Sequence, residues 1–190
     1  MRFAINGFGR VGRSLLRVYR AREDARAVLE LAAINEIADA DTVVHLARYD
    51  SNYGRYPGLI ARSGDLLAID QSLVPLSHVP EVSALPWRAL NIDLVFECTG
   101  AFTDRATAEQ HLHSGAERVL FSHPAESDVD ATIVFGVNDQ DLTAEMDVVS
   151  AASCTTNAVV PVLSTLSQAF GIEAATITTC LLYTSDAADE

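Results

Sequence analysis

The sequence is poor in basic residues and has no long apolar run. Its 190 residues include 13 Lys and Arg against 26 Asp and Glu, which gives a formal net charge of −13. A surface that binds nucleic acid or an anionic membrane needs clustered Lys and Arg, so we expect neither partner. No apolar run approaches the roughly 20 residues that span a bilayer, and the first residues have no signal-peptide pattern. These features predict a cytoplasmic protein.

Cysteine is also scarce, since the chain has only Cys98, Cys154 and Cys180. They form no C-x-x-C motif and no even set, so reduced thiols are a simpler reading than a disulfide framework. His111 and His113 form an H-L-H pair in a short polar segment, which we interpret as the solvated face of a helix. Two histidines without a third ligand are too few for zinc, and we expect no metal site.

The remaining composition is that of a globular protein, with 49% apolar and 21% charged residues. Apolar strand-like stretches alternate with segments of helical spacing, which predicts an α/β fold with a Rossmann-type, doubly wound, mainly parallel sheet. We expect strands within residues 3–5, 27–35, 92–100, 118–122, 131–137 and 146–153, helices within 10–22, 39–50, 107–116 and 154–170, and small antiparallel strands between 51 and 80.

A glycine motif follows the first expected strand and opens the first expected helix. Gly7, Gly9 and Gly12 have the G-x-G-x-x-G spacing that binds dinucleotides. Gly7 would allow the tight turn, Gly9 the close approach of a pyrophosphate, and Gly12 the packing of helix against strand. An ordinary glycine-rich turn between strand and helix is the alternative.

Glu36 directly follows the second expected strand, where dinucleotide-binding proteins place an acidic residue. Its carboxylate could accept hydrogen bonds from the adenosine ribose, and its charge would repel a 2′-phosphate. NAD is therefore preferred over NADP as the cofactor. A solvated loop glutamate is the competing interpretation.

Cys154 precedes an apolar run with helical spacing, in "SCTTNAVVPVL". Cysteine reacts as the thiolate, and a helix N-terminus stabilises that form. The hydroxyl groups of Ser153 and Thr155 could orient a substrate oxygen beside it. The alternative is an inert buried thiol, a description that fits Cys98 in "LVFECTG" better.

The segments "INGFGRVGR", "AINE", "CTGAF" and "ASCTTN" together resemble the glyceraldehyde-3-phosphate dehydrogenase superfamily, from Met1 to about Thr179. Several stretches, among them "FSHP" followed by "DVDAT", look closer to its erythrose-4-phosphate dehydrogenase branch. The resemblance implies a phosphosugar aldehyde as substrate and a homotetrameric parent enzyme. It also implies cofactor contacts from Arg10, Val11, Glu36, Thr99 and Ser122, besides the glycines, and substrate contacts from Ser153 and Thr155. Pro80 stands where the family generally has an arginine on the adenine side.

The resemblance also implies a chemistry for Cys154. Its sulfur would attack the aldehyde to give a thiohemiacetal, which is oxidised to a thioester. In the erythrose branch water releases 4-phosphoerythronate, on the route to pyridoxal phosphate, and in the glycolytic branch inorganic phosphate resolves the thioester. Oxidation needs a base, which in the family is a histidine just after the "TITT" segment. No histidine follows Cys154 here, and Leu181 occupies that register.

We therefore divide the chain into an NAD-binding domain (residues 1–150), the start of an α+β catalytic domain with the nucleophile helix and a first strand (151–179), and a tail (180–190). The tail, "CLLYTSDAADE", resembles a translated sequencing adapter and is interpreted as non-native, with a diverged natural C-terminus as the alternative. The parent enzyme is expected to oxidise erythrose 4-phosphate, with glyceraldehyde 3-phosphate as the second candidate. The 190-residue chain is expected to bind NAD without turnover. A cysteine hydrolase is disfavoured, because it explains neither the glycine motif nor Glu36.

Overall fold

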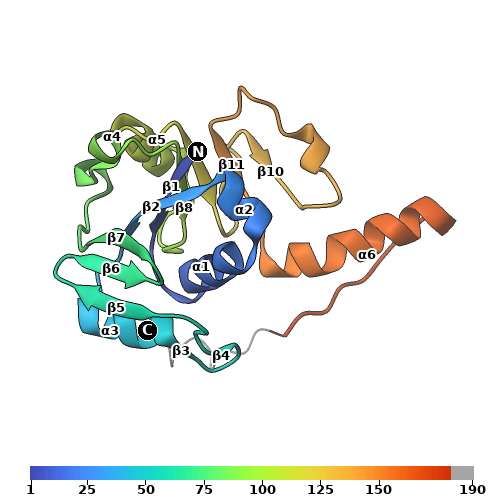
Figure 1. The fold of residues 1–190 in the computed structure, drawn as a ribbon. Coiled ribbons are helices and arrows are strands. Elements are labelled where there is room, and N and C mark those ends of the chain that lie inside the picture. Colours follow the sequence, from blue (N-terminus) through green and yellow to red (C-terminus); the bar gives the residue numbers. More distant parts are fainter. Residues whose placement is uncertain (181–190) are drawn as a thin grey trace.

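The computed structural model describes residues 1–180, and its main feature is a nine-stranded sheet with helices packed on both faces (Figure 1). The strand order is β10-β11-β9-β8-β1-β2-β7-β6-β5, parallel from β10 to β7 and antiparallel from β7 to β5. The strands are β1 (Arg2–Asn6), β2 (Glu30–Asn35), β5 (Ile60–Ser63), β6 (Leu66–Ile69), β7 (Ser72–Ser77), β8 (Leu94–Glu97), β9 (Arg118–Phe121), β10 (Ala131–Thr132) and β11 (Val148–Ser150), and a separate hairpin pairs β3 (Tyr49–Asp50) with β4 (Gly54–Arg55). The predicted α/β class with a mainly parallel sheet is confirmed.

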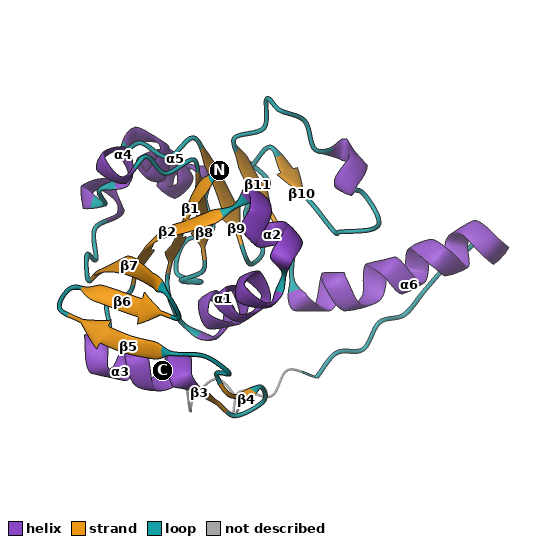
Figure 2. Cartoon of the chain, in the orientation of Figure 1, coloured by secondary structure: helices purple, strands orange, loops and turns teal. Residues whose placement is uncertain are grey.

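Six α-helices are found in the described part of the chain (Figure 2). They are α1 (Arg10–Ala21), α2 (Glu23–Val28), α3 (Ala40–Arg48), α4 (Trp87–Leu90), α5 (Arg105–His113) and α6 (Cys154–Phe170). The sequence predicted α1, α3, α5 and α6 close to these bounds. Asp39 caps α3, because its carboxylate accepts hydrogen bonds from the backbone N–H groups of Asp41 and Thr42 at 3.1 and 2.9 Å.

Alternate residues of β1 face two different cores, as the two-residue period of a strand requires. Phe3 and Ile5 belong to the core beneath α1 and α3. Ala4 belongs to the opposite core, where Trp87 of α4 is fully buried. Both faces of the central strands are therefore covered, as is usual for a parallel sheet.

Three predicted elements differ from the structure. The strand expected from residue 27 begins only at Glu30, because the preceding residues form the short, unburied helix α2. The strand expected at 131–137 ends at Thr132, since Val137 N–H bonds to Val134 O and Gly136 adopts φ 79°, which turns the chain. Residues 171–180 form no strand, because no partner strand pairs with them in the described part of the chain.

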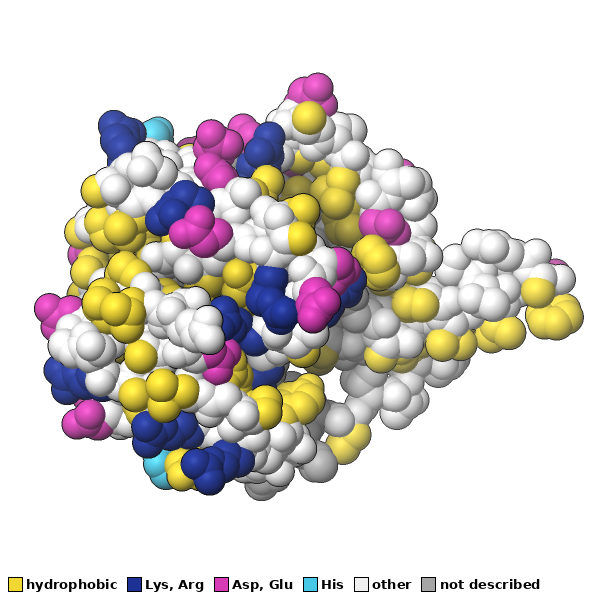
Figure 3. Space-filling model, in the orientation of Figure 1, with side chains coloured by type: hydrophobic (Ala, Val, Ile, Leu, Met, Phe, Trp, Pro, Cys, Tyr) yellow, Lys and Arg dark blue, Asp and Glu magenta, His cyan; other side chains and the backbone are white. Residues whose placement is uncertain are grey.

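Helix α6 projects away from the sheet, and none of its residues is buried (Figures 1 and 3). Val162, Leu166 and Phe170 on it are exposed, the last by 84%. Among residues 1–180 no helix is long and apolar enough to cross a membrane. The predicted non-native tail, apart from Cys180, and the position of Leu181 lie outside the described residues.

Candidate functional site

The predicted site residues follow the carboxyl ends of parallel strands, which all meet at one edge of the sheet. Gly7 follows β1, Glu36 follows β2, and Thr99 follows β8. Ser122 follows β9, and the turn to Cys154 follows β11. The chain crosses from β1 to β2 on one side and later returns to place β8 on the other, so the glycine turn lies where the strand order reverses. Ligands of doubly wound sheets bind at such a switch point.

The glycine turn is built as the motif predicts. Gly7 has φ 87°, and a Cβ there would lie 2.6 Å from the backbone nitrogen of Thr99. A Cβ on Gly12 would lie 2.3 Å from the carbonyl oxygen of Gly7, so only glycine lets α1 approach β1 this closely. A Cβ on Gly9 would meet no atom within 4 Å, which leaves open space in front of the N-terminus of α1. That space suits a phosphate group, because the free N–H groups of a helix N-terminus attract anions.

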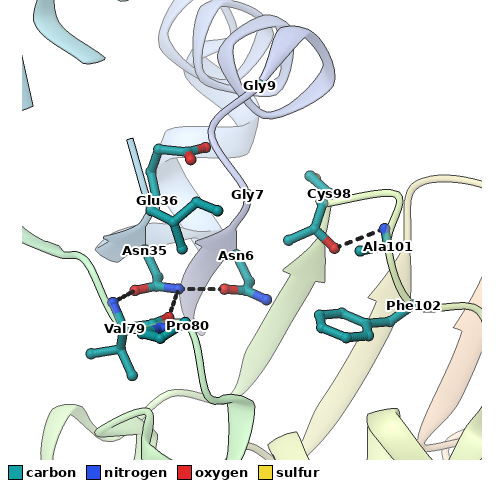
Figure 4. A pocket seen from close by; sticks show the side chains of 12 residues that line it. Asn6, Gly7, Gly9, Asn35, Glu36, Val79, Pro80, Cys98, Ala101 and Phe102 are labelled. Carbon is teal, nitrogen blue, oxygen red and sulfur yellow. Dashed lines mark hydrogen bonds between the residues drawn. The ribbon is translucent and has the colours of Figure 1, made fainter. Parts of the chain in front are cut away.

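A cavity of about 280 Å³ opens beside this turn (Figure 4). It is lined by Asn6, Gly7, Gly9, Asn35, Glu36, Ile37, Val79, Pro80, Cys98, Thr99, Ala101 and Phe102. A second cavity of about 560 Å³ shares Gly9, Glu36, Ile37 and Thr99 with it, so the two cavities adjoin at these residues. The mixture of apolar walls and a few fixed polar groups is typical of a cofactor site.

Glu36 is fixed against the glycine turn instead of being a solvated loop residue. Its Oε2 accepts a hydrogen bond from the Phe8 N–H at 2.6 Å, and its Oε1 accepts one from the Ala38 N–H at 3.1 Å. The carboxylate is half-buried and lines both cavities. Each oxygen keeps a lone pair that a ribose hydroxyl could use.

The other predicted cofactor residues differ in whether they line the two cavities. Thr99 lines both cavities, and Pro80, at the position where the family resemblance predicts arginine, lines the smaller one. Arg10 and Val11 form the first turn of α1 and are absent from the linings of these two cavities. Ser122 is half-buried, and its side chain bonds to the thiol of Cys98.

Cys154 is the first residue of α6 and is exposed, so the inert buried interpretation does not describe it. Ser153 is the N-cap, and its Oγ accepts the Thr156 N–H at 2.9 Å. The preceding residue, Ala152, has φ 61°, a left-handed conformation that is unfavourable for alanine. It is held by Ser150, whose Oγ accepts the Ala152 N–H at 3.0 Å and donates to the carbonyl oxygen of His123 at 2.8 Å.

The strand order gives an estimate of the distance between the strands that lead to the glycine turn and to Cys154. Three strand steps separate β1 from β11, which is about 14 Å at the usual spacing. The turns that lead to Gly7 and to Cys154 therefore leave the same edge of the sheet three strands apart. Thr155 is exposed beside Cys154 in the first turn of α6.

A buried polar network beneath the cavity was missed by the sequence analysis. His111, interpreted as solvated, is 0% exposed, because α5 turns this face toward the sheet, whereas His113 is exposed as expected. The His111 ring bonds to Trp87 and Glu97, and Glu97 is also 0% exposed. A glutamate ending the apolar strand "LVFE" was the available signal, since a buried strand rarely carries a charge without a role. No group of three or more potential metal ligands occurs among residues 1–180.

Iodoacetamide is expected to alkylate Cys154 in the native chain and to leave Cys98 unmodified. Burial, opposed by a Ser122 hydrogen bond and reinforced by the charge of Glu97, raises the pKa of the Cys98 thiol to about 12. Only the thiolate reacts, so a mildly alkaline buffer leaves Cys98 inert. Peptide mapping by mass spectrometry measures both sites, with the chain in guanidinium chloride as the fully labelled control. Comparable labelling of the two residues in the native chain would contradict the assignment.

Two family models match the chain. The NAD-binding domain of glyceraldehyde 3-phosphate dehydrogenase matches residues 1–105, and the C-terminal domain of the same enzyme matches residues 153–190. The first match contains the glycine turn, Glu36 and Thr99, and the second contains Cys154.

Proposed function

The chain belongs to the glyceraldehyde 3-phosphate dehydrogenase family, and on that premise we propose that it is part of an enzyme that oxidises D-erythrose 4-phosphate to 4-phosphoerythronate with NAD. The observation that carries the proposal is the placement of an exposed cysteine, at a helix N-terminus, on the same sheet edge as the glycine turn. The NAD-binding domain of this family makes NAD the cofactor. When bound, NAD supplies the hydride acceptor.

The chain's own residues would act as follows. Gly7, Gly9 and the first turn of α1 hold the pyrophosphate, and Glu36 accepts the ribose hydroxyls. The sulfur of Cys154 attacks the aldehyde carbon, so a C–S bond forms and the carbonyl oxygen becomes a hydroxyl group. Ser153 and Thr155 flank this oxygen and orient it. Conversion of this adduct to a thioester would require loss of a hydride from its carbon to the bound cofactor and of its hydroxyl proton to a base. In the thioester, water would attack the carbonyl carbon, the C–S bond would break, and the Cys154 thiol and the acid product would be released.

The choice of erythrose 4-phosphate rests on the "FSHP" segment, which resembles the erythrose branch. Here the Nε2–H of His123 donates to the Phe102 carbonyl oxygen at 2.7 Å, which ties the loop after β9 to the wall of the cavity. Glyceraldehyde 3-phosphate, with phosphate resolving the thioester, is the second candidate, favoured by the family whose models match.

We further propose that the parent enzyme is a cytoplasmic homotetramer, in which the apolar face of α6 is covered.

The 190-residue chain is expected to form no NADH from NAD and either aldehyde, because no histidine follows Cys154 to take the hydroxyl proton of the adduct. The aldehyde should nevertheless slow the alkylation of Cys154, since the adduct occupies its sulfur, and erythrose 4-phosphate should do so at lower concentration. Absorbance of NADH and peptide mapping of alkylated Cys154 measure the two effects, with Cys180 as the internal reference. NADH formation would refute the proposed lack of turnover, and equal protection by both aldehydes would remove the preference for erythrose 4-phosphate.

A further inference from the structure

The buried carboxylate of Glu97 has four hydrogen-bond donors, and each of them is a neutral group. Its Oε2 accepts from Asn6 Nδ2 at 2.6 Å and from His111 Nε2 at 3.0 Å. Its Oε1 accepts from the Thr99 N–H at 2.8 Å and from the Thr99 hydroxyl. Burial alone would raise the pKa of Glu97, but bonds from His111, Thr99 and Asn6 outweigh burial and hold that pKa below its ordinary value.

His111 is a neutral donor because of Trp87. The indole Nε1–H lies 2.9 Å from His111 Nδ1, and an indole nitrogen can only donate. The lone pair of Nδ1 must therefore face the indole, and the single ring proton sits on Nε2, where it bonds to Glu97. The pair is thus a carboxylate and a neutral imidazole, and it keeps one net negative charge in the interior.

A buried charge without a cationic partner is costly, so proteins keep few of them. The charge of Glu97 acts on the next residue along the chain, because it adds to the rise in the pKa of the Cys98 thiol. Asn6 and Thr99, which Glu97 holds, both line the cavity beside the glycine turn. The fixed charge therefore lies directly beneath the proposed cofactor site.

Strand order places this charge near the strand that leads to Cys154. Glu97 ends β8, and β11 is two strands away, so the ends of these two strands are about 10 Å apart. Under the proposed function the ring would have to reach Cys154 from the glycine turn after β1, so the cofactor would pass the carboxyl end of β8, where Glu97 lies. Two unit charges 10 Å apart in a protein interior interact strongly enough to change an equilibrium by about tenfold.

We propose that Glu97 determines which redox form of the cofactor the site prefers, by favouring the cationic nicotinamide of NAD⁺ over the neutral ring of NADH. This inference rests on the proposed function. Both forms carry the same pyrophosphate and adenosine, so any repulsion of the phosphates by Glu97 cancels in the ratio of their dissociation constants. The ratio therefore isolates the effect of the charge on the ring.

The test is to titrate NAD⁺ and NADH separately into the wild-type chain and into Glu97→Gln, Glu97→Asp and Glu36→Gln. In Glu97→Gln the ratio Kd(NADH)/Kd(NAD⁺) should fall by about 3- to 10-fold. Glu97→Asp keeps the charge and should keep the ratio. Glu36→Gln removes a charge that follows β2, four strands from β11. It should therefore weaken the binding of both NAD⁺ and NADH and leave the ratio of their dissociation constants unchanged.

If Glu97 had only a structural role, Glu97→Gln would weaken the binding of NAD⁺ and NADH equally. An unchanged ratio Kd(NADH)/Kd(NAD⁺) in that variant would therefore overturn the inference. If that variant unfolds, all four chains are titrated in sucrose, which favours the folded state without contacting the site. Failure of the wild-type chain to bind either form would overturn the proposed function and this inference with it.

Discussion

Gly9→Ala is expected to weaken NAD binding by about 10- to 100-fold while leaving the melting temperature of the chain nearly unchanged. A Cβ at position 9 meets no protein atom within 4 Å, and the residue has φ −67°, so alanine fits the folded chain. The methyl group would occupy the open space in front of the N-terminus of α1, where the pyrophosphate is proposed to lie. Calorimetric titration measures the affinity, and thermal unfolding measures the stability.

Gly12→Ala is the contrasting variant in the same motif. Its Cβ would lie 2.3 Å from the Gly7 carbonyl oxygen, so α1 must move away from β1. Overpacking of this kind costs about 1–3 kcal/mol, which lowers the melting temperature by several degrees. Val18→Ala, on the exposed side of α1, is the neutral control. Normal NAD affinity in Gly9→Ala would show that no phosphate group approaches this turn.

Trp87→Ala is expected to lower the free energy of unfolding by about 3–5 kcal/mol. Trp87 is fully buried in the cluster that contains Ala4 and Val95, so truncation leaves a cavity in the second core. It also leaves His111 Nδ1 without its donor at a fully buried position. Urea unfolding followed by circular dichroism measures the change, since the variant lacks the only tryptophan of the chain.

Trp87→Phe separates the two contributions. It keeps most of the ring volume but removes the indole N–H, so it should cost only about 1–2 kcal/mol. Leu73→Ala, at an exposed position, should change stability by no more than about 0.5 kcal/mol. A loss below about 1 kcal/mol in Trp87→Ala would mean that this core is not packed as described.

The parts of the fold that depend on neighbouring residues could be predicted from the sequence. The glycine spacing, the apolar strand before it and the helical pattern after it lie within about twenty residues, and each supports the others. Cys154 at the start of α6 follows from an equally local signal.

The parts that depend on distant contacts could not be predicted. The burial of His111 requires Trp87, 24 residues away, and Glu97, 14 residues away, and the short segment around it reads as polar. The lengths of β10 and β2 depend on local turns and on α2, which have only weak sequence signals. The resemblance implied a cofactor contact for Thr99, but only the structure shows that the Glu97 carboxylate accepts its backbone N–H.

Isothermal titration calorimetry of NAD into the 190-residue chain tests the central claim most directly. We expect one NAD to bind per chain and NADP to bind much more weakly, because Glu36 beside the glycine turn repels a 2′-phosphate. A folded chain that releases or absorbs no heat with NAD, or that binds NADP as tightly, would contradict it.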